Sequence, residues 1–203
     1  MPKYRGRCPV NWALINGENE TGATLHEMVR EPDAGDIVMQ EKVTIEQNDT
    51  AYTLFGKITD AAVSTIKKFY PLLDKGSFKK IPQNHSRATV FGGRKPQDGS
   101  FTWDQDARSI YNLVRAVTHP YPGAFTTVAG RNFTVWWAQP YDGEMPRAEV
   151  PGTILSLKRG AGVTVAVSKG ALLLKRVQWD GEEEKSADLF ARDNKLKVGA
   201  ILR

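Results

Sequence analysis

The sequence has a single cysteine, Cys8, so no internal disulfide can form. It has no apolar run near the roughly 20 residues that a membrane-spanning helix needs. No apolar stretch follows the opening residues MPKYR, as one would in a secretory signal. From these absences we expect a cytoplasmic protein without a membrane partner, since unpaired thiols persist in reducing compartments. Cys8 has no adjacent base to activate it, and we interpret it as an inert thiol. We also expect no metal site.

A strong charge of one sign is also lacking. Lysine and arginine total 28 against 23 aspartates and glutamates, which gives a net charge of +5. This small excess favours an anionic partner, such as a phosphorylated substrate or nucleic acid. The basic residues are scattered, however, apart from Lys67–Lys68, Lys79–Lys80 and the neighbours Arg5 and Arg7. A mixed, solvated surface explains this charge as well as a nucleic-acid stripe does.

The stretch from Thr21 to Gln40 contains the most suggestive chemistry. It holds His26, and its Asp33 opens an Asp-Ala-Gly turn that is followed by the apolar run 37–39. A carboxylate on a tight turn beside a buried strand suits acid/base catalysis. Most Asp-Ala-Gly turns are only turns, so this pattern alone decides nothing.

Residues 1–7 are predicted to form a loop, because proline and glycine interrupt them. Within such a loop Tyr4, Arg5 and Arg7 would make a cationic cradle for a phosphate or carboxylate. The alternative is an ordered N-terminal tail with no ligand. The apolar run Pro9–Ile15 then predicts a short helix, since proline is tolerated in a first helical turn.

Alternating apolar residues predict two strands, Glu20–Arg30 and Ile37–Val43, with the Asp33 loop between them. A long helix should begin after Thr50, a favourable N-cap, and end at Pro71. Its buried face is predicted from helical spacing to hold Leu54, Phe55, Ile58, Ala61, Ala62, Ile66 and Phe69.

Residues 74–99 are polar and rich in glycine, proline and lysine, which is typical of a surface linker. Asp104 is the predicted N-cap of a second helix, with a buried side made of Ala107, Ile110, Tyr111, Val114 and Val117. Short strands follow, predicted at Ala124–Val128, Asn132–Ala138, Gly152–Leu157, Val163–Val167 and Ala171–Gln178. Such a series favours a small closed barrel.

The pattern therefore predicts a mixed α/β part over 1–80, a linker over 81–100 and a β-rich domain over 101–203. The first part has too few strands to form a doubly wound sheet covered on both faces. In the second part Trp136 and Trp137 should alternate between core and surface. An exposed tryptophan on a small barrel could stack a nucleic-acid base, although packing is the commoner role.

Several segments, in this order, resemble the folate-dependent formyltransferases. Pro2–Gly6 resembles the end of the family's Ser-Leu-Leu-Pro-x-x-Arg-Gly loop, and Thr21–His26 followed by Asp33 resembles its second signature. Pieces of the C-terminal half resemble the family's barrel domain: Pro122–Phe125, Pro151–Ile154 and Val198–Gly199. Pro2–Trp12 and His119–Phe125 look more like the UDP-4-amino-4-deoxy-L-arabinose and other sugar N-formyltransferases than like the methionyl-tRNA enzymes.

The resemblance implies the C-terminal remainder of a Rossmann-like formyltransferase domain followed by a small OB-like β-barrel. In this family a formyl group moves from N10-formyltetrahydrofolate to an amine. An Asn and a His stabilise the oxyanion, and an Asp handles the proton. Asp33 matches that aspartate, with His26 as its support. The pterin loop is matched by Asp33, Ala34, Gly35, Asp36 and Ile37, and the substrate cleft by Tyr4, Arg5, Gly6 and Arg7.

One departure from the family is serious. The family's Asn-x-His motif precedes the Ser-Leu-Leu-Pro loop, and no Asn-x-His occurs in these 203 residues. We therefore expect the N-terminal half of the family's domain to be missing and this chain alone to be inactive. The edge left by missing strands should make the chain self-associate or pair with that missing half.

The expected acceptor is a nucleotide-linked amino sugar. Two alternatives remain open: a methionyl-tRNA formyltransferase relative, with tRNA the disfavoured partner, and a non-catalytic module that binds nucleic acid or protein through the barrel. Clustering of basic side chains around an exposed Trp136 or Trp137 would favour the module, and the side chains concerned are Arg131, Lys158, Arg159, Lys175 and Arg176.

Overall fold

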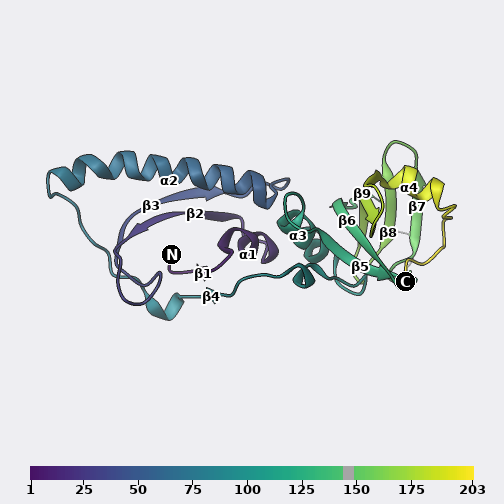
Figure 1. Cartoon of the computed structure of the whole chain (residues 1–203), viewed down its shortest axis with the longest axis horizontal. Coiled ribbons are helices and arrows are strands. Elements are labelled where there is room, and N and C mark those ends of the chain that lie inside the picture. The colour runs from purple at the N-terminus through teal and green to yellow at the C-terminus, as the bar shows by residue number, and fades with distance from the viewer. Residues whose placement is uncertain (144–148) are drawn as a thin grey trace. The chain divides into compact units, whose positions relative to one another are not determined.

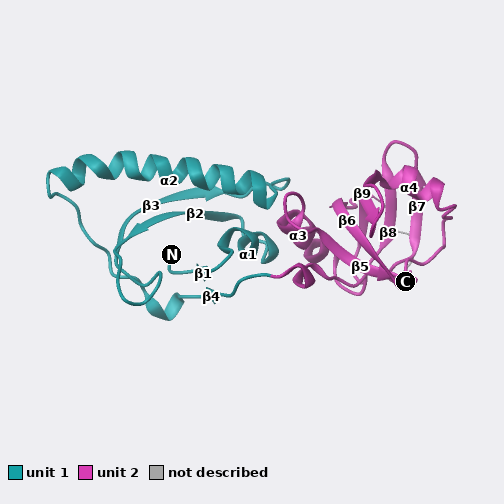
Figure 2. Ribbon diagram, in the orientation of Figure 1, with its two compact units in different colours: residues 1–94 teal, residues 95–203 magenta. Residues whose placement is uncertain are grey.

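The computed structural model describes residues 1–143 and 149–203. They form two compact units, Met1–Arg94 and Lys95–Arg203 (Figures 1 and 2). Each unit buries its own set of apolar side chains. Within the part of the chain that the structure describes, no helix is both long and apolar enough to cross a membrane.

Unit 1 is built on an antiparallel hairpin and one long helix. Strand β2 (Glu20–His26) pairs with β3 (Ile37–Thr44), and α2 (Ala51–Asp74) lies along both strands (Figure 1). The pairing runs from Glu20 opposite Thr44 to His26 opposite Ile37, so residues 27–36 form the connecting loop. Both predicted strands are confirmed, although the first ends at His26 and not at Arg30.

The N-terminal segment forms more structure than a loop. Arg5–Gly6 make a short strand, β1, that pairs in parallel with β4 (Val90–Phe91), so the prediction of a plain loop over 1–7 was wrong. The pairing needs Gly6, because a Cβ there would lie 2.4 Å from the Phe91 carbonyl oxygen. Helix α1 (Pro9–Ile15) follows with the predicted bounds. A 3₁₀ turn, η1 (His85–Arg87), precedes β4.

Helix α2 begins as predicted but departs from the prediction in two respects. Thr50 is its N-cap and accepts a hydrogen bond from the Thr53 amide. Pro71 does not end the helix, which continues to Asp74; the proline is exposed, so water can satisfy the carbonyl whose partner it removes. Phe55 and Ile66, predicted for the buried face, are 59% and 57% exposed on the outer side.

Unit 2 is a six-stranded antiparallel sheet with two helices. The main order is β5 (Ala124–Val128), β6 (Arg131–Pro140), β9 (Ala171–Trp179), β8 (Gly162–Ala166) and β7 (Ile154–Lys158), with β10 (Lys185–Ser186) beside β9. The five predicted strands are confirmed. Among the described residues β5 and β7 end the sheet and do not pair with each other, so no closed barrel is seen there.

The helices of unit 2 cover this sheet, and a 3₁₀ turn, η2 (Pro96–Gly99), precedes them. Helix α3 (Ala107–Val117) packs on β6, and α4 (Ala187–Asp193) packs on β9 and β8. All five side chains predicted for the buried side of α3 are buried. Its N-cap is Asp106, whose carboxylate accepts from the Ser109 amide at 3.0 Å, and not the predicted Asp104.

The tryptophan pair does not follow the predicted alternation. Trp136 and Trp137 are both half-buried, because the register between β6 and β9 shifts at this point. Trp136 stacks on His119 with ring centroids 3.8 Å apart, and Trp137 meets the Tyr111 ring edge-on. One face of Trp136 is therefore already occupied by the His119 ring.

Candidate active site

The loop between β2 and β3 has a defined shape. Asp33 adopts a left-handed conformation with φ of 59°, a conformation that asparagine and aspartate tolerate better than most residues. Gly35 packs against the chain entering the loop, where a Cβ would lie 2.1 Å from the Glu27 carbonyl oxygen. The Glu27 amide also donates to the Asp36 carbonyl at 3.0 Å. The loop thus closes on itself and holds the Asp33 side chain in one place.

The Asp33 carboxylate lies against the N-terminal segment. Its Oδ2 accepts a hydrogen bond from the Gly6 amide at 2.8 Å. The structure therefore brings together two of the sequence-predicted site segments, which lie 27 residues apart in the chain. A carboxylate that accepts from a backbone amide is fixed in orientation and stays a competent acceptor through its other oxygen.

That other oxygen faces His26, the second predicted catalytic residue. Nε2 of His26 lies 3.8 Å from Oδ1 of Asp33, with both side chains partly exposed. The Nδ1 atom donates to the Glu27 carbonyl at 2.8 Å, since a carbonyl can only accept. In the neutral ring Nε2 then has no hydrogen, so a direct attraction to Asp33 requires the imidazolium form. At this distance the pair is an electrostatic contact and not a hydrogen bond.

Gln83 is a site residue that the sequence analysis missed. Its side chain, in a residue only 5% exposed, donates to the Asp33 and Gly35 carbonyls at 2.9 and 2.6 Å. Its Oε1 accepts from the Arg5 guanidinium at 2.7 Å. One amide thus links β1 to the Asp33 loop. The only signal in the sequence was a polar residue between Pro82 and Asn84 in a stretch predicted to be a linker.

The predicted substrate-cleft residues point in different directions. Arg5 is buried, with its guanidinium on Gln83 and close to His85, so it supports the loop from within. Arg7 is exposed and its guanidinium lies over Gly93. Gly6 meets Asp33 through its backbone. The structure therefore places Arg7, but not Arg5, where a bound anion could reach it.

The Tyr4 ring packs into an aromatic stack. Its ring lies parallel to Phe91 at 5.1 Å, and Trp12 stacks on Phe91 at 5.0 Å. Its hydroxyl donates to Glu18 at 2.8 Å and accepts from Asn16. Burial is the largest cause that raises the pKa of Tyr4, and the Glu18 carboxylate raises it further against the lowering effect of Asn16. Tyr4 therefore stays neutral and is a packing and hydrogen-bonding group here.

The predicted pterin loop is only partly accessible. Ala34, Gly35 and Ile37 are buried, whereas Asp33 and Asp36 are partly exposed. The carbonyls of Asp33, Gly35 and Asp36 are already hydrogen-bonded within unit 1. A ring held by this loop would therefore meet the two aspartates and the outward edge of the backbone between them.

A groove of about 420 Å³ lies beside this site. Met1–Tyr4 line one side, and the face of the hairpin around Thr24 and Gln40 lines the other. Asp33 and His26 are not among its lining residues. Among the described residues no group of three His, Cys, Asp or Glu side chains is arranged to hold a metal ion.

Two of the basic side chains that the binding-module alternative depends on are paired with acidic ones. Arg131 pairs with Glu182 at 2.8 Å and covers the Trp179 ring. Arg176 pairs with Glu184 at 2.6 Å, and Glu184 also bonds His119. Two of the five predicted cations are thus neutralised locally, which disfavours the binding-module alternative.

Two family models match the chain. The formyl transferase model matches residues 1–69, and the formyl transferase C-terminal domain model matches residues 94–195. Together they cover most of the sequence, in the order expected for one protein. The chain therefore belongs to the formyl transferase family.

Solved structures share this fold. HypX from Aquifex aeolicus, solved with tetrahydrofolic acid, matches with a TM-score of 0.69 and 22% identity over 97% of this chain and 34% of that one. An N-formyltransferase from Helicobacter canadensis, solved with folinic acid and dTDP-3-aminofucose, has a TM-score of 0.66 and 19% identity, covering 86% and 62%. Methionyl-tRNA formyltransferase from Clostridium thermocellum has a TM-score of 0.57 and 24% identity, covering 71% and 61%. The chain thus spans about a third of HypX and about three fifths of the other two.

Proposed function

We propose that residues 1–203 supply the aspartate side of a formyl-transfer site that uses N10-formyltetrahydrofolate in the cytoplasm. The acceptor we propose is the amino group of a nucleotide-linked amino sugar. The observation that carries this proposal is the hydrogen bond from the Gly6 amide to Asp33. It joins the segment assigned to the substrate cleft to the carboxylate assigned to proton transfer. Family membership supports the reaction class, and the single cysteine is the support for the compartment.

The folate, when bound, supplies the formyl group. Its ring would lie against the loop edge between Asp33 and Asp36, and HypX and the Helicobacter enzyme were both solved with folates. Asp33 would accept the proton that the attacking amine releases, since one carboxylate oxygen is fixed by Gly6 and the other faces outward. The His26 ring lies beside that oxygen, with Nε2 3.8 Å from Oδ1, and would help to position it.

The choice of acceptor rests on local sequence. Pro2–Trp12 and His119–Phe125 resemble the sugar enzymes more than the tRNA enzymes. The Helicobacter structure contains a dTDP-linked aminosugar, which is acceptor chemistry of the proposed kind. A methionyl-tRNA formyltransferase relative is the alternative, and a steep fall of tRNA affinity with salt would favour it.

The proposal also holds that this site is incomplete within residues 1–203, which contain no Asn-x-His. The test is to incubate the purified chain with N10-formyltetrahydrofolate and a UDP-linked amino sugar, with and without a family segment that carries the motif. Formylated product is measured by mass spectrometry. We expect product only when the segment is supplied.

Product from residues 1–203 alone would refute the incompleteness. No product after the segment is supplied, from a folded chain, would refute the proposed site. Circular dichroism of the same preparation establishes that the chain is folded.

A further inference from the structure

The outer side of α2 carries large apolar side chains that the structure leaves exposed. Their exposed fractions run from 45% for Val63 to 68% for Tyr52 and Tyr70. We call this set the α2 stripe, and its members are Tyr52, Phe55, Val63, Ile66, Tyr70 and Leu73. The opposite side of the helix is buried against the hairpin. Large apolar side chains that gather on the exposed side of a surface helix often mark an interface.

The spacing of the stripe favours another helix as its occupant. Val63, Ile66, Tyr70 and Leu73 follow one another at steps of three, four and three residues. This alternation is the seam of helix-on-helix packing. A helix that covers a sheet has a broader apolar face, and α2 already uses its inner side in that way. The stripe is narrow, because polar side chains border it.

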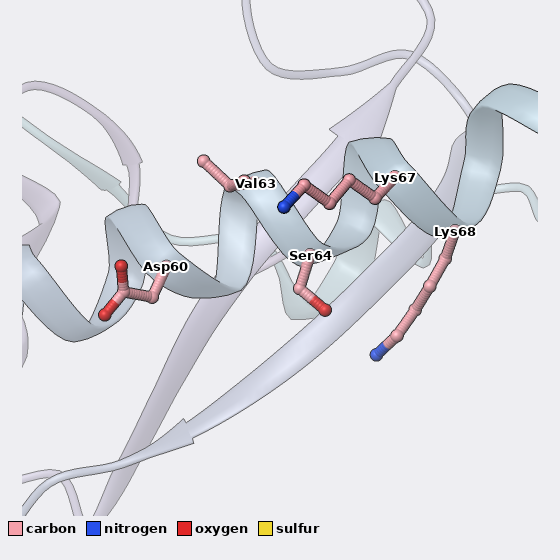
Figure 3. A pocket seen from close by; sticks show the side chains of 5 residues that line it. All are labelled: Asp60, Val63, Ser64, Lys67 and Lys68. Carbon is pink, nitrogen blue, oxygen red and sulfur yellow. The ribbon is translucent and has the colours of Figure 1, made fainter.

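Two of the polar side chains that border the stripe indicate which helix packs on it. Asp60 and Lys67 lie about one turn before and one turn after Val63, around a shallow hollow of about 480 Å³ (Figure 3). Neither has an ion-pair partner among residues 1–143 and 149–203, whereas the adjacent Lys68 pairs with Glu41 on the hairpin. An acidic residue before the centre and a basic residue after it form a self-complementary pattern, because each can pair with the opposite charge of a second, identical helix.

A second copy of α2 satisfies this pattern when it runs antiparallel. A two-fold axis at Val63 brings Asp60 of each copy near Lys67 of the other, as an isologous interface requires. The same axis places Tyr52 and Phe55 of one copy within about one residue of the level of Leu73 and Tyr70 of the second copy. A parallel copy in register would instead set Asp60 level with Asp60, so only the antiparallel arrangement matches both charge and shape.

We propose that the chain forms an antiparallel dimer through the α2 stripe, centred on Val63. The helix is about 36 Å long, and one helix from each copy makes up the proposed interface. We expect such a dimer to dissociate in the micromolar range, as transient associations do.

The first test is sedimentation velocity of the full chain from low to high micromolar concentration. We expect a shift from monomer to dimer. Val63→Glu places a charge at the axis and should raise the dissociation constant by at least about 30-fold. Val198→Glu, at an exposed valine of unit 2, is the matched control and should leave it unchanged. A chain that stays monomeric throughout, or a dimer that Val63→Glu leaves intact, would overturn the proposal.

The second test concerns orientation. Asp60→Lys and Lys67→Asp should each weaken the dimer, and the double swap should restore it, because the antiparallel pairs are re-formed with reversed sign. In a Cys8→Ser background, Tyr52→Cys mixed with Leu73→Cys should give a disulfide-linked heterodimer under oxidation. Single swaps without effect, or no heterodimer in that mixture, would contradict the antiparallel arrangement.

Discussion

The arrangement of Asp33 depends on a side chain that does not itself face the site. Gln83 holds the Asp33 and Gly35 carbonyls with one end and the Arg5 guanidinium with the other. Arg5, Gln83 and Gly35 are buried, so water cannot readily replace the amide if it is lost. The position of the carboxylate is therefore a consequence of a buried polar network.

Gln83→Leu should destabilise unit 1 by about 2–4 kcal/mol, because it takes a donor from two carbonyls and an acceptor from the buried Arg5 guanidinium. Urea unfolding followed by the fluorescence of Trp12, the tryptophan of unit 1, measures the effect once the other four are replaced by phenylalanine. Gln97→Leu, at an exposed glutamine of η2, should change the free energy of unfolding by less than about 0.5 kcal/mol. Equal effects of the two substitutions would show that the network contributes nothing.

Among the secondary-structure elements, α2 shows where prediction from sequence succeeds and fails. Its start followed from Thr50, and its inner residues Leu54 and Ala61 followed from helical spacing. Spacing could not tell which apolar residues face inward, because both sides of this helix are apolar, and Phe55 and Ile66 were assigned to the wrong side.

The start of α2 also depends on Asp49. Its carboxylate accepts from the Glu46 amide and the Thr53 hydroxyl and pairs with Lys57 at 2.7 Å. Burial, the largest single cause, raises the pKa of Asp49, but these hydrogen bonds and the Lys57 charge together lower it below its ordinary value of 3.8. Because the pKa of Asp49 is lower in the folded chain than in the unfolded chain, ionised Asp49 stabilises the fold at pH values above its pKa in the unfolded chain. This contribution is lost as the pH falls through the pKa of Asp49 in the folded chain.

Asp49→Asn should therefore cost about 1–3 kcal/mol at neutral pH and progressively less as the pH falls below about 4. The free energy of unfolding, measured by urea titration across this pH range, gives the difference. Asp74→Asn, at an exposed aspartate at the end of the same helix, serves as the control and should have little effect. A cost for Asp49→Asn that does not depend on pH would contradict the ionic origin.

At the scale of the whole molecule, the chain is two units with separate cores. The sequence predicted nearly all the strands of unit 2, because turns and alternation are local signals. It did not predict β1, the pairing of β1 with β4, or Gln83, since these depend on contacts between residues about 80 positions apart. Asp33 was identified by family resemblance, whereas its contact with Gly6 emerged only from the fold.

The separate core of unit 2 predicts that residues 95–203 fold alone. Its largest buried side chains, Tyr111 and Phe133 among them, belong to the same unit as the strands and helices around them. The isolated segment should therefore show a cooperative thermal transition by circular dichroism. Gradual unfolding without a transition would mean that unit 1 is needed to complete this core. The predicted domain boundaries at residues 80 and 100 remain proposals, as does the closure of the unit 2 sheet into an OB-like barrel. NMR of the same isolated segment can address them.

The most direct test of the proposed function measures the rate of formyl transfer by the chain supplied with the Asn-x-His segment. The rate of the unaltered chain is compared with that of the Asp33→Asn variant. Asparagine can still accept from Gly6 but cannot take a proton, so the loop should keep its shape while proton transfer fails. We predict a fall in kcat of about 100- to 10,000-fold, with Asp74→Asn unchanged. An Asp33→Asn chain that transfers formyl groups as fast as the unaltered one would contradict the role of Asp33.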